Sequence, residues 1–257
     1  MPRPALLYAV LLALALAGAG CGGKKQTARN VPPAPEMPEK SATHPKQGAR
    51  AKEGTAFKDP GPLESVPGIH VDPNAKVIWS EVGWASWYGP NYHLKKAANG
   101  ELYNQNEMTA AHNTLPLNSI VRVVNLRSNL ATVVRITDRG PFVADRVIDL
   151  SAAAAKAVNV YLPGTAEVRL DVLEAPKPIE TGGRGCVQIG AFKAQADALH
   201  LKEHLLHRYP GAQVLQFKGP TGYWVRIRVH ADEKEKTQEV YRHTQVEEGG
   251  VFMVRLD

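Results

Sequence analysis

An aspartate ends one of the most apolar runs of the sequence. In VVRITDRGPF (133–142), Asp138 follows a β-branched run and is followed by Arg-Gly-Pro. A carboxyl group at a strand end can donate and then accept a proton, provided that an apolar or anionic surrounding keeps it partly protonated near neutral pH. Arg139 would oppose this if its guanidinium lay close, but successive strand side chains point to opposite faces, so we expect it to point away. The alternative is that Asp138 only organises the turn.

Two further side chains could act with Asp138. Glu101 lies in the loop sequence ANGE, where it adds a like charge or is itself the acid; a solvated carboxylate is the alternative. His112 lies in TAAHNTLP and could orient a carboxyl group or a hydroxyl, although a lone histidine is more often a hydrogen-bonded core residue. Asp149, in the short run RVIDL, is interpreted as a buried structural carboxylate satisfied by the backbone or by Arg146.

Short β-rich runs must position these residues. They are separated by turn residues and span 119–125, 131–138, 146–150 and 165–173. One short helix, SAAAAKAVN, begins at Ser151, which is a preferred N-cap residue. Many short strands with one small helix predict a compact β-barrel.

The last part of the chain has a different pattern. Beyond about residue 185, the predicted order is strand, helix, strand, strand, helix, strand, which indicates a small α+β sheet domain. The first of these helices, 194–209, ends before Pro210-Gly211. Its predicted apolar face consists of Ala198, Leu199, Leu205, Leu206 and Tyr209.

The N-terminal segment carries features of export. Residues 1–21 combine Arg3, an apolar stretch and small residues, which is typical of a signal peptide. GAGC resembles a bacterial lipobox in which Cys21 would be lipidated; ordinary signal cleavage is the alternative. Residues 22–75 are rich in proline and charged residues without apolar periodicity, and they predict a disordered tether.

Composition argues against several classes of protein. The 257 residues carry a net charge of +6 with no dense basic helix, so nucleic acid is not an expected partner. The two cysteines, Cys21 and Cys186, form no disulfide framework, and we expect Cys186 to pack as a small hydrophobe at a strand start. Motifs for metal ligation, nucleophilic catalysis or phosphate binding are not found, so neither a metal nor a cofactor is expected.

Three stretches of the first domain resemble a known family. They are GWASWYGP (83–90), AANGELYNQNEMTAAHNTLP (97–116) and TDRGPF with RVIDLS (137–151). In motif, order and spacing they are similar to the rare lipoprotein A family, septal-ring lytic transglycosylases with a double-psi β-barrel. VQIGAF (187–192) makes the last 75 residues resemble a SPOR domain, a peptidoglycan-binding module. The resemblance implies a mainly β double-psi β-barrel followed by a small α+β (βαββαβ) SPOR-like domain.

The resemblance also implies a reaction. It is cleavage of the β-1,4 bond between N-acetylmuramic acid and N-acetylglucosamine, with a 1,6-anhydro product and a preference for strands without stem peptides. Carried over by position, Asp138, Glu101 and His112 are the catalytic residues. Asn99 and Arg139, from the same motifs, are candidate substrate contacts. One carboxyl group suffices for such a reaction, because the muramic acid 6-hydroxyl is an internal nucleophile.

Aromatic and polar residues supply further candidate glycan contacts. In the first domain, the rings of Trp87 and Tyr88 could stack on sugars, since the apolar face of a pyranose suits an indole or a phenol; packing in the barrel core is the alternative. In the second domain, strand alternation predicts that some candidates face the helices instead. These second-domain candidates are Gln188, Phe192, Tyr223 and Trp224.

The predicted organisation has five segments. They are a signal peptide with a lipobox (1–21), a tether (22–75), a double-psi β-barrel catalytic domain (76–175), a linker (176–184) and a SPOR peptidoglycan-binding domain (185–257). We expect a lipid-anchored protein of the outer membrane at the division septum, where it acts in cell wall organisation and daughter-cell separation with division-site proteins as partners. The alternatives are a non-catalytic, expansin-like peptidoglycan-binding protein and a septal structural tether.

Overall fold

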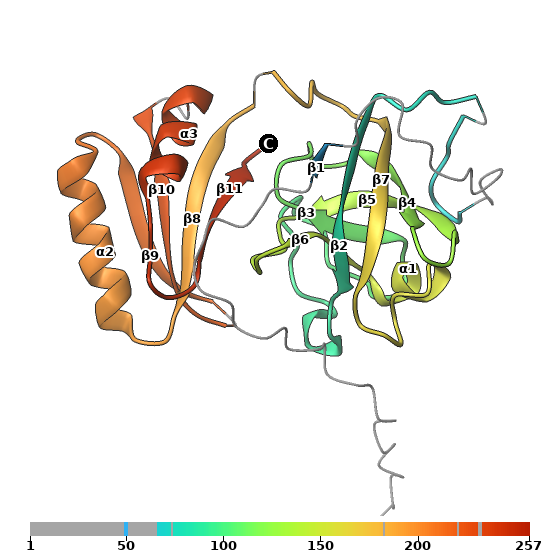
Figure 1. Cartoon of the computed structure of the whole chain (residues 1–257), viewed down its shortest axis with the longest axis horizontal. Coiled ribbons are helices and arrows are strands. Elements are labelled where there is room, and N and C mark those ends of the chain that lie inside the picture. The colour runs from blue at the N-terminus through green and yellow to red at the C-terminus, as the bar shows by residue number, and fades with distance from the viewer. Residues whose placement is uncertain (1–48, 51–65, 73, 182, 220, 231–232) are drawn as a thin grey trace, which may run out of the picture. The chain divides into compact units, whose positions relative to one another are not determined.

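The structure is a computed structural model that describes residues 49–50, 66–72, 74–181, 183–219, 221–230 and 233–257. The predicted signal peptide, the lipobox cysteine Cys21 and most of the predicted tether lie outside these residues. Within them, no helix is both long and apolar enough to cross a membrane. The described chain forms two separate β-sheets (Figure 1).

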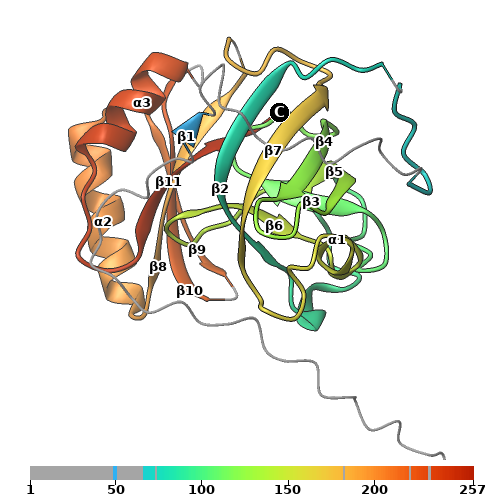
Figure 2. The ribbon, with the colours of Figure 1, turned by 45° about the vertical axis from the view of Figure 1, so that its right-hand side comes forward.

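The first sheet closes on itself. Its strands pair in the order β1-β2-β6-β3-β5-β4-β7, and an additional pairing of β2 with β7 closes β2 to β7 into a six-stranded barrel (Figures 1 and 2). The pairs β2–β6 and β3–β5 are parallel. The compact β-barrel predicted from the sequence is therefore confirmed. The strands are β1 (Ala49–Arg50), β2 (Trp79–Trp87), β3 (Thr109–His112), β4 (Ile120–Asn125), β5 (Ala131–Asp138), β6 (Arg146–Leu150) and β7 (Ala166–Glu174).

Alternation along the strands fills the barrel. Val121 and Val123 on β4 are fully buried, as are Val134 and Ile136 on β5, and the polar residue between each pair is more exposed. This period of two is the one that places every second strand residue in a core. Short helices α1 (Ala152–Ala157) and η1 (Pro90–Tyr92, a 3₁₀ helix) complete this domain.

Elements with a clear local sequence signal were predicted, and elements without one were missed. The Ser151 hydroxyl accepts a hydrogen bond from the backbone N–H of Ala154, so the predicted cap of α1 is confirmed. Strands β2 and β3 were not predicted as strands. The sequence of β2 had been interpreted through its aromatic cluster, and β3 is only four residues long and contains two alanines, which have a low β-propensity.

The second sheet is an antiparallel sheet of four strands in the order β11-β8-β10-β9. Helices α2 and α3 both cover one face of it (Figures 1 and 2). The predicted order of strands and helices is confirmed, and Cys186 is fully buried near the start of the first strand. The elements are β8 (Gly185–Phe192), α2 (Gln195–Arg208), β9 (Gln213–Gly219), β10 (Gly222–Arg228), α3 (Lys234–His243) and β11 (Gly250–Arg255).

The predicted apolar face of α2 was partly wrong. Leu199 and Leu206 are 40% and 37% exposed, whereas Leu205 is buried. Leu199 and Leu206 each lie one residue beyond the buried stripe, and one residue turns a helix by about 100°. The stripe that packs against the sheet is Ala198, Leu201, Leu205 and Tyr209, with spacings of three and four residues.

Adjacent leucines of α2 provide a test of this packing. Leu205 is 2% exposed and Leu206 is 37% exposed. Leu205→Ala should lower the free energy of unfolding by about 2–5 kcal/mol, because it leaves a cavity in the core. Leu206→Ala, the matched control, should lower it by less than about 1 kcal/mol. Urea unfolding of the full chain measures both, and equal losses would contradict the observed orientation of α2.

Candidate active site

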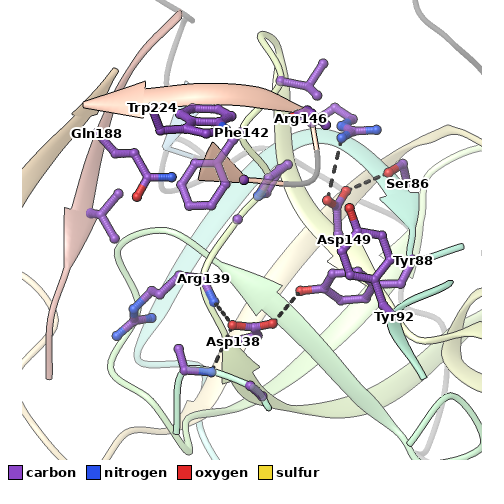
Figure 3. Close-up of a pocket in the computed structure, with 18 of the residues that line it drawn as sticks. Ser86, Tyr88, Tyr92, Asp138, Arg139, Phe142, Arg146, Asp149, Gln188 and Trp224 are labelled. Atoms are coloured by element: carbon purple, nitrogen blue, oxygen red, sulfur yellow. Dashed lines mark hydrogen bonds and ion pairs between the residues drawn. The ribbon is translucent and has the colours of Figure 1, made fainter. Parts of the chain in front are cut away.

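The strand register places two carboxylates on either side of one alanine. Ala111 on β3 is the Cα partner of Asp138 on β5 and of Asp149 on β6. Neighbouring strands lie about 4.8 Å apart, so the two aspartate Cα atoms are about 10 Å apart. Residues directly opposite each other point to the same face, and both aspartates line the same pocket (Figure 3). Ala111 itself is fully buried between them.

Asp138 lies in a surrounding that favours its protonated form. Its Oδ1 accepts hydrogen bonds from the backbone N–H groups of Ala98 (2.9 Å) and Arg139 (2.8 Å), and the Tyr88 hydroxyl lies 3.4 Å from its Oδ2 (Figure 3). Burial raises the pKa of this carboxyl group, and the three hydrogen bonds oppose but do not cancel that effect. A proton donor at this position needs a pKa shift in this direction.

The Arg139 guanidinium points away from the Asp138 carboxylate, as expected. It donates hydrogen bonds to the backbone carbonyls of His112 (3.0 Å) and Leu115 (2.7 Å), and only its backbone N–H reaches Asp138. Burial lowers the pKa of Arg139 to about 10, so the side chain remains charged at neutral pH. The guanidinium, which had been a candidate substrate contact, is thus engaged by the protein itself.

Glu101 does not lie beside Asp138. Its exposed carboxylate forms a two-point ion pair with Arg135, with N–O distances of 3.0 and 2.8 Å. This hydrogen bonding lowers the pKa of Glu101, which favours a charged residue over an acid. Asn99 ties the same loop to strand β5: its side chain accepts from the Glu101 N–H, and its backbone N–H donates to the Thr137 carbonyl.

His112 is buried and does not line the pocket of the two aspartates. Its Nδ1 accepts hydrogen bonds from the backbone N–H groups of Thr114 (3.2 Å) and Leu115 (3.0 Å). The ring proton must therefore lie on Nε2, which donates to the Glu81 carboxylate at 2.9 Å. His112 orders the turn whose carbonyl groups hold Arg139, and it contacts Asp138 only through that chain of contacts.

The two aromatic candidates of the barrel have different environments. Trp87 also lines the pocket, but it is 3% exposed and its ring lies 4.5 Å from that of Tyr161, so little of its surface is free to stack on a sugar. Tyr88 lines the pocket beside Asp138 and Asp149. Burial and these two carboxylates raise the pKa of the Tyr88 phenol well above its ordinary value, so it stays a hydrogen-bond donor.

The pocket position of Asp149 was missed by sequence reasoning. Its carboxylate accepts a hydrogen bond from the Ser86 hydroxyl (2.5 Å) and forms an ion pair with Arg146 at 3.6 Å (Figure 3). The partnership with Arg146 had been expected. The pocket position follows from the pairing of β6 with both β2 and β3, in which Ser86 and Ala111 are the partners of Asp149. Tyr92 also lines this pocket.

The four candidates of the second domain divide between the two faces of its sheet, as alternation predicted. Phe192 is buried in the core beneath the helices, and the partly buried Tyr223 packs against that core. Gln188 and Trp224 belong to the other face. The Gln188 side-chain carbonyl accepts hydrogen bonds from Arg226. Among the described residues of both domains, no group of three or more potential metal ligands is present.

Comparison with known proteins gives the same two domains. Residues 80–170 match the family model described as lytic transglycolase, and residues 181–251 match that of the SPOR domain. The first domain is therefore a double-psi β-barrel of the lytic transglycolase class, followed by a SPOR domain. This combination of domains agrees with the resemblance to the rare lipoprotein A family that the motifs indicated.

Individual relatives agree with this assignment. The chain is 40% identical over 193 residues to the endolytic peptidoglycan transglycosylase RlpA of Helicobacter pylori strain 26695, covering 63% of this chain and 61% of that protein. It is 46% identical over 140 residues to the protein of that name from Campylobacter jejuni, covering 45% and 51%. It is 54% identical over 92 residues to a probable endolytic peptidoglycan transglycosylase RlpA of Synechocystis, covering 36% and 29%. The chain thus spans about half to three fifths of the length of the first two relatives.

The opposite pKa shifts of the two carboxyl groups can be tested directly. In a ¹³C NMR titration of side-chain carboxyl groups, Asp138 should titrate above its ordinary value of 3.8 and Glu101 below 4.5. Arg135→Met should raise the pKa of Glu101 more than that of Asp138, because of these two carboxyl groups only Glu101 bonds directly to the guanidinium. Arg127→Met, at an exposed arginine elsewhere on the barrel, is the control. A depressed pKa for Asp138 would argue against the site described.

Proposed function

We propose that this chain is an endolytic peptidoglycan transglycosylase that cleaves the bond between N-acetylmuramic acid and N-acetylglucosamine. The observation that carries the proposal is the Asp138 carboxyl group, whose pKa burial raises, in the pocket of a lytic transglycolase barrel. The names of the relatives support the same reaction. No cofactor takes part in this chemistry.

The proposed reaction uses Asp138 twice. Protonated Asp138 donates its proton to the glycosidic oxygen as the bond from C1 of the muramic acid breaks, and N-acetylglucosamine leaves with a free 4-hydroxyl group. The muramic acid 6-hydroxyl oxygen then attacks C1 and closes the 1,6-anhydro ring. Its proton passes to the Asp138 carboxylate, which restores the starting acid. Water is neither consumed nor released.

Two neighbours support this cycle. The Tyr88 hydroxyl can donate to Asp138 Oδ2 when the carboxylate is transiently charged. Asp149, which accepts from Ser86 and faces Arg146, places a second carboxylate in the pocket. A carboxylate there stabilises the positive charge that develops at C1 in an oxocarbenium-like transition state.

Glu101 and His112 are proposed as positioning residues. Glu101 holds Arg135 and, through the loop 97–101, the backbone N–H of Ala98 that bonds to Asp138. His112 holds the turn whose carbonyl groups bind the Arg139 guanidinium. Both therefore act on Asp138 through backbone groups.

The wider biological setting is also proposed. The SPOR domain supports binding to peptidoglycan and a location at the division septum, where the enzyme would assist cell wall organisation and daughter-cell separation. The end of β7 at residue 174 and the start of β8 at residue 185 support a catalytic domain at 76–175, a linker at 176–184 and a SPOR domain at 185–257. We further propose peptide-free glycan strands as the substrate, division-site proteins as partners and a lipid anchor at Cys21 in the outer membrane.

Replacing the proposed acid tests the reaction. Asp138→Asn should lower the rate of cleavage of peptide-free strands at least about 100-fold, because an amide cannot donate the proton. Mass spectrometry of the products of the full chain should show 1,6-anhydro ends with the parent only. Asp145→Asn, at an exposed aspartate of the following loop, is the matched control and should cleave like the parent. Binding of strands without any product would instead favour the expansin-like alternative, and neither binding nor cleavage would favour a structural tether.

A second candidate reaction is hydrolysis, and the position of Asp149 favours it. Inverting glycosidases use one carboxylic acid and a second carboxylate that activates water, with the two carboxyl groups well separated. Asp138 and Asp149 on either side of Ala111 have that general arrangement. Reducing ends in place of anhydro ends would identify this reaction, and Asp149→Asn would then abolish cleavage as completely as Asp138→Asn.

The pH dependence of cleavage provides a separate test. Activity that needs protonated Asp138 is present below the folded-state pKa of this group and is lost as the pH rises through it. The hydrogen bond from Tyr88 lowers the pKa of Asp138, so Tyr88→Phe should raise it and move the loss of activity to a higher pH. Tyr92→Phe, which removes a hydroxyl group not bonded to Asp138, should leave the profile in place. A shift to lower pH in Tyr88→Phe would contradict the assignment of Asp138 as the acid.

A further inference from the structure

Lys96 is a cation of the pocket that lacks a carboxylate partner among the described residues. Its exposed side chain lines the same pocket as Asp138 and Asp149. The two arginines on the barrel wall of that pocket are engaged: Arg146 forms an ion pair with Asp149, and Arg139 donates to backbone carbonyl groups. Lys96 therefore retains its ammonium group for a ligand.

The backbone that carries Lys96 is held firmly. The N–H of Ala97 donates to the Glu101 carbonyl (2.8 Å), and the N–H of Gly100 donates to the Ala97 carbonyl (3.0 Å), which closes a tight turn. Gly100 has a φ of +95°, a conformation that glycine adopts without strain. Within this turn the N–H of Ala98 donates to Asp138, so Lys96 lies two residues from a direct contact with the proposed acid.

The charge of the pocket favours an anionic ligand. On its barrel wall, Lys96, Arg139 and Arg146 are cationic, and Asp138 and Asp149 are the acidic groups. Burial raises the pKa of Asp138, and the proposed reaction starts from its protonated form, so Asp149 alone then offsets three cations. Such a surface attracts negative charge at short range, with screening by salt.

A peptidoglycan glycan strand offers one type of anion. The sugars are neutral except for the lactyl ether on O3 of each muramic acid, which ends in a carboxyl group. This group is a free carboxylate where the stem peptide has been removed, and it is a neutral amide where the peptide is attached. The lactyl group belongs to the same ring as the C1–O bond that breaks, so a cation two residues from the contact with Asp138 is suitably placed.

We propose that Lys96 binds the free lactyl carboxylate of muramic acid and thereby selects strands without stem peptides. This inference rests on the proposed function and assigns the substrate preference to one residue. The ion pair between Lys96 and the lactyl carboxylate would favour peptide-free strands, because an attached stem peptide converts that carboxylate into a neutral amide.

The test compares two forms of one ligand. Peptide-free glycan oligomers with free lactyl carboxylates are matched by the same oligomers with these groups converted to neutral methylamides. Binding to the full chain is measured by calorimetry in the Asp138→Asn background, so that cleavage does not consume the ligand. Lys96→Gln should weaken binding of the carboxylate oligomer about three- to fivefold, the range of a partly exposed ion pair, and leave the amide oligomer unaffected. The preference of the parent for the carboxylate oligomer over the amide oligomer should vanish at about 1 M salt. Lys96→Arg, which keeps the positive charge, should retain most of this preference.

Lys76→Gln is the matched control, because Lys76 is an exposed lysine that does not line the pocket. The proposal is overturned if Lys96→Gln weakens both oligomers equally, if it weakens neither, or if Lys76→Gln has the same effect. Because the readout is binding, the result does not depend on cleavage. A chain that discriminates through Lys96 but yields no anhydro ends would retain this inference while the proposed reaction fails.

Discussion

The pairing of β3 with both β5 and β6 is the constraint on which the rest of the site depends. Ala111 lies opposite Asp138 on one side and opposite Asp149 on the other. A shift of either pairing by one residue would turn one carboxylate to the opposite face of the sheet. The closed barrel prevents such a shift, because all six strands pair on both sides and their inward residues share one core. The position of the two carboxylates is thus a property of the whole barrel.

Desolvation and ion pairing give the carboxyl groups of this domain different roles. Asp138 receives three hydrogen bonds, each of which favours its charged form, yet burial dominates and raises its pKa. Glu101 is exposed, so little desolvation opposes its charged form. The two-point contact with Arg135 therefore lowers its pKa. An exposed ion pair contributes only about 0–1 kcal/mol to stability. The value of the Glu101–Arg135 pair to the site therefore lies mainly in fixing the turn at 97–101.

Features that depend on a local sequence pattern were predicted correctly. Features that depend on pairing between distant segments were not. Strand β5 and the cap at Ser151 follow from β-branched residues and from capping chemistry, and both were predicted. The place of Asp149 in the pocket depends on the pairing of β3 with β6, which no local pattern encodes. The prediction that Leu199 and Leu206 lie on the buried face of α2 was wrong. Which of two adjacent leucines faces the sheet is decided by tertiary packing. His112 was identified by its motif, but its burial against Glu81 depends on strand β2, which had not been predicted.

The turn at 97–101 connects the proton chemistry of the site with its charge. Ala98 donates to Asp138 and favours the carboxylate, so this turn limits how far burial can raise the pKa. The same turn holds Lys96 on the pocket wall, where an ammonium group favours an anionic ligand. Binding of a carboxylate beside Lys96 would neutralise that cation and add negative charge near Asp138. Both changes favour the protonated acid, because a nearby anion raises the pKa of a carboxyl group. A substrate that carries a free lactyl carboxylate would therefore help to keep Asp138 in the form that starts the reaction.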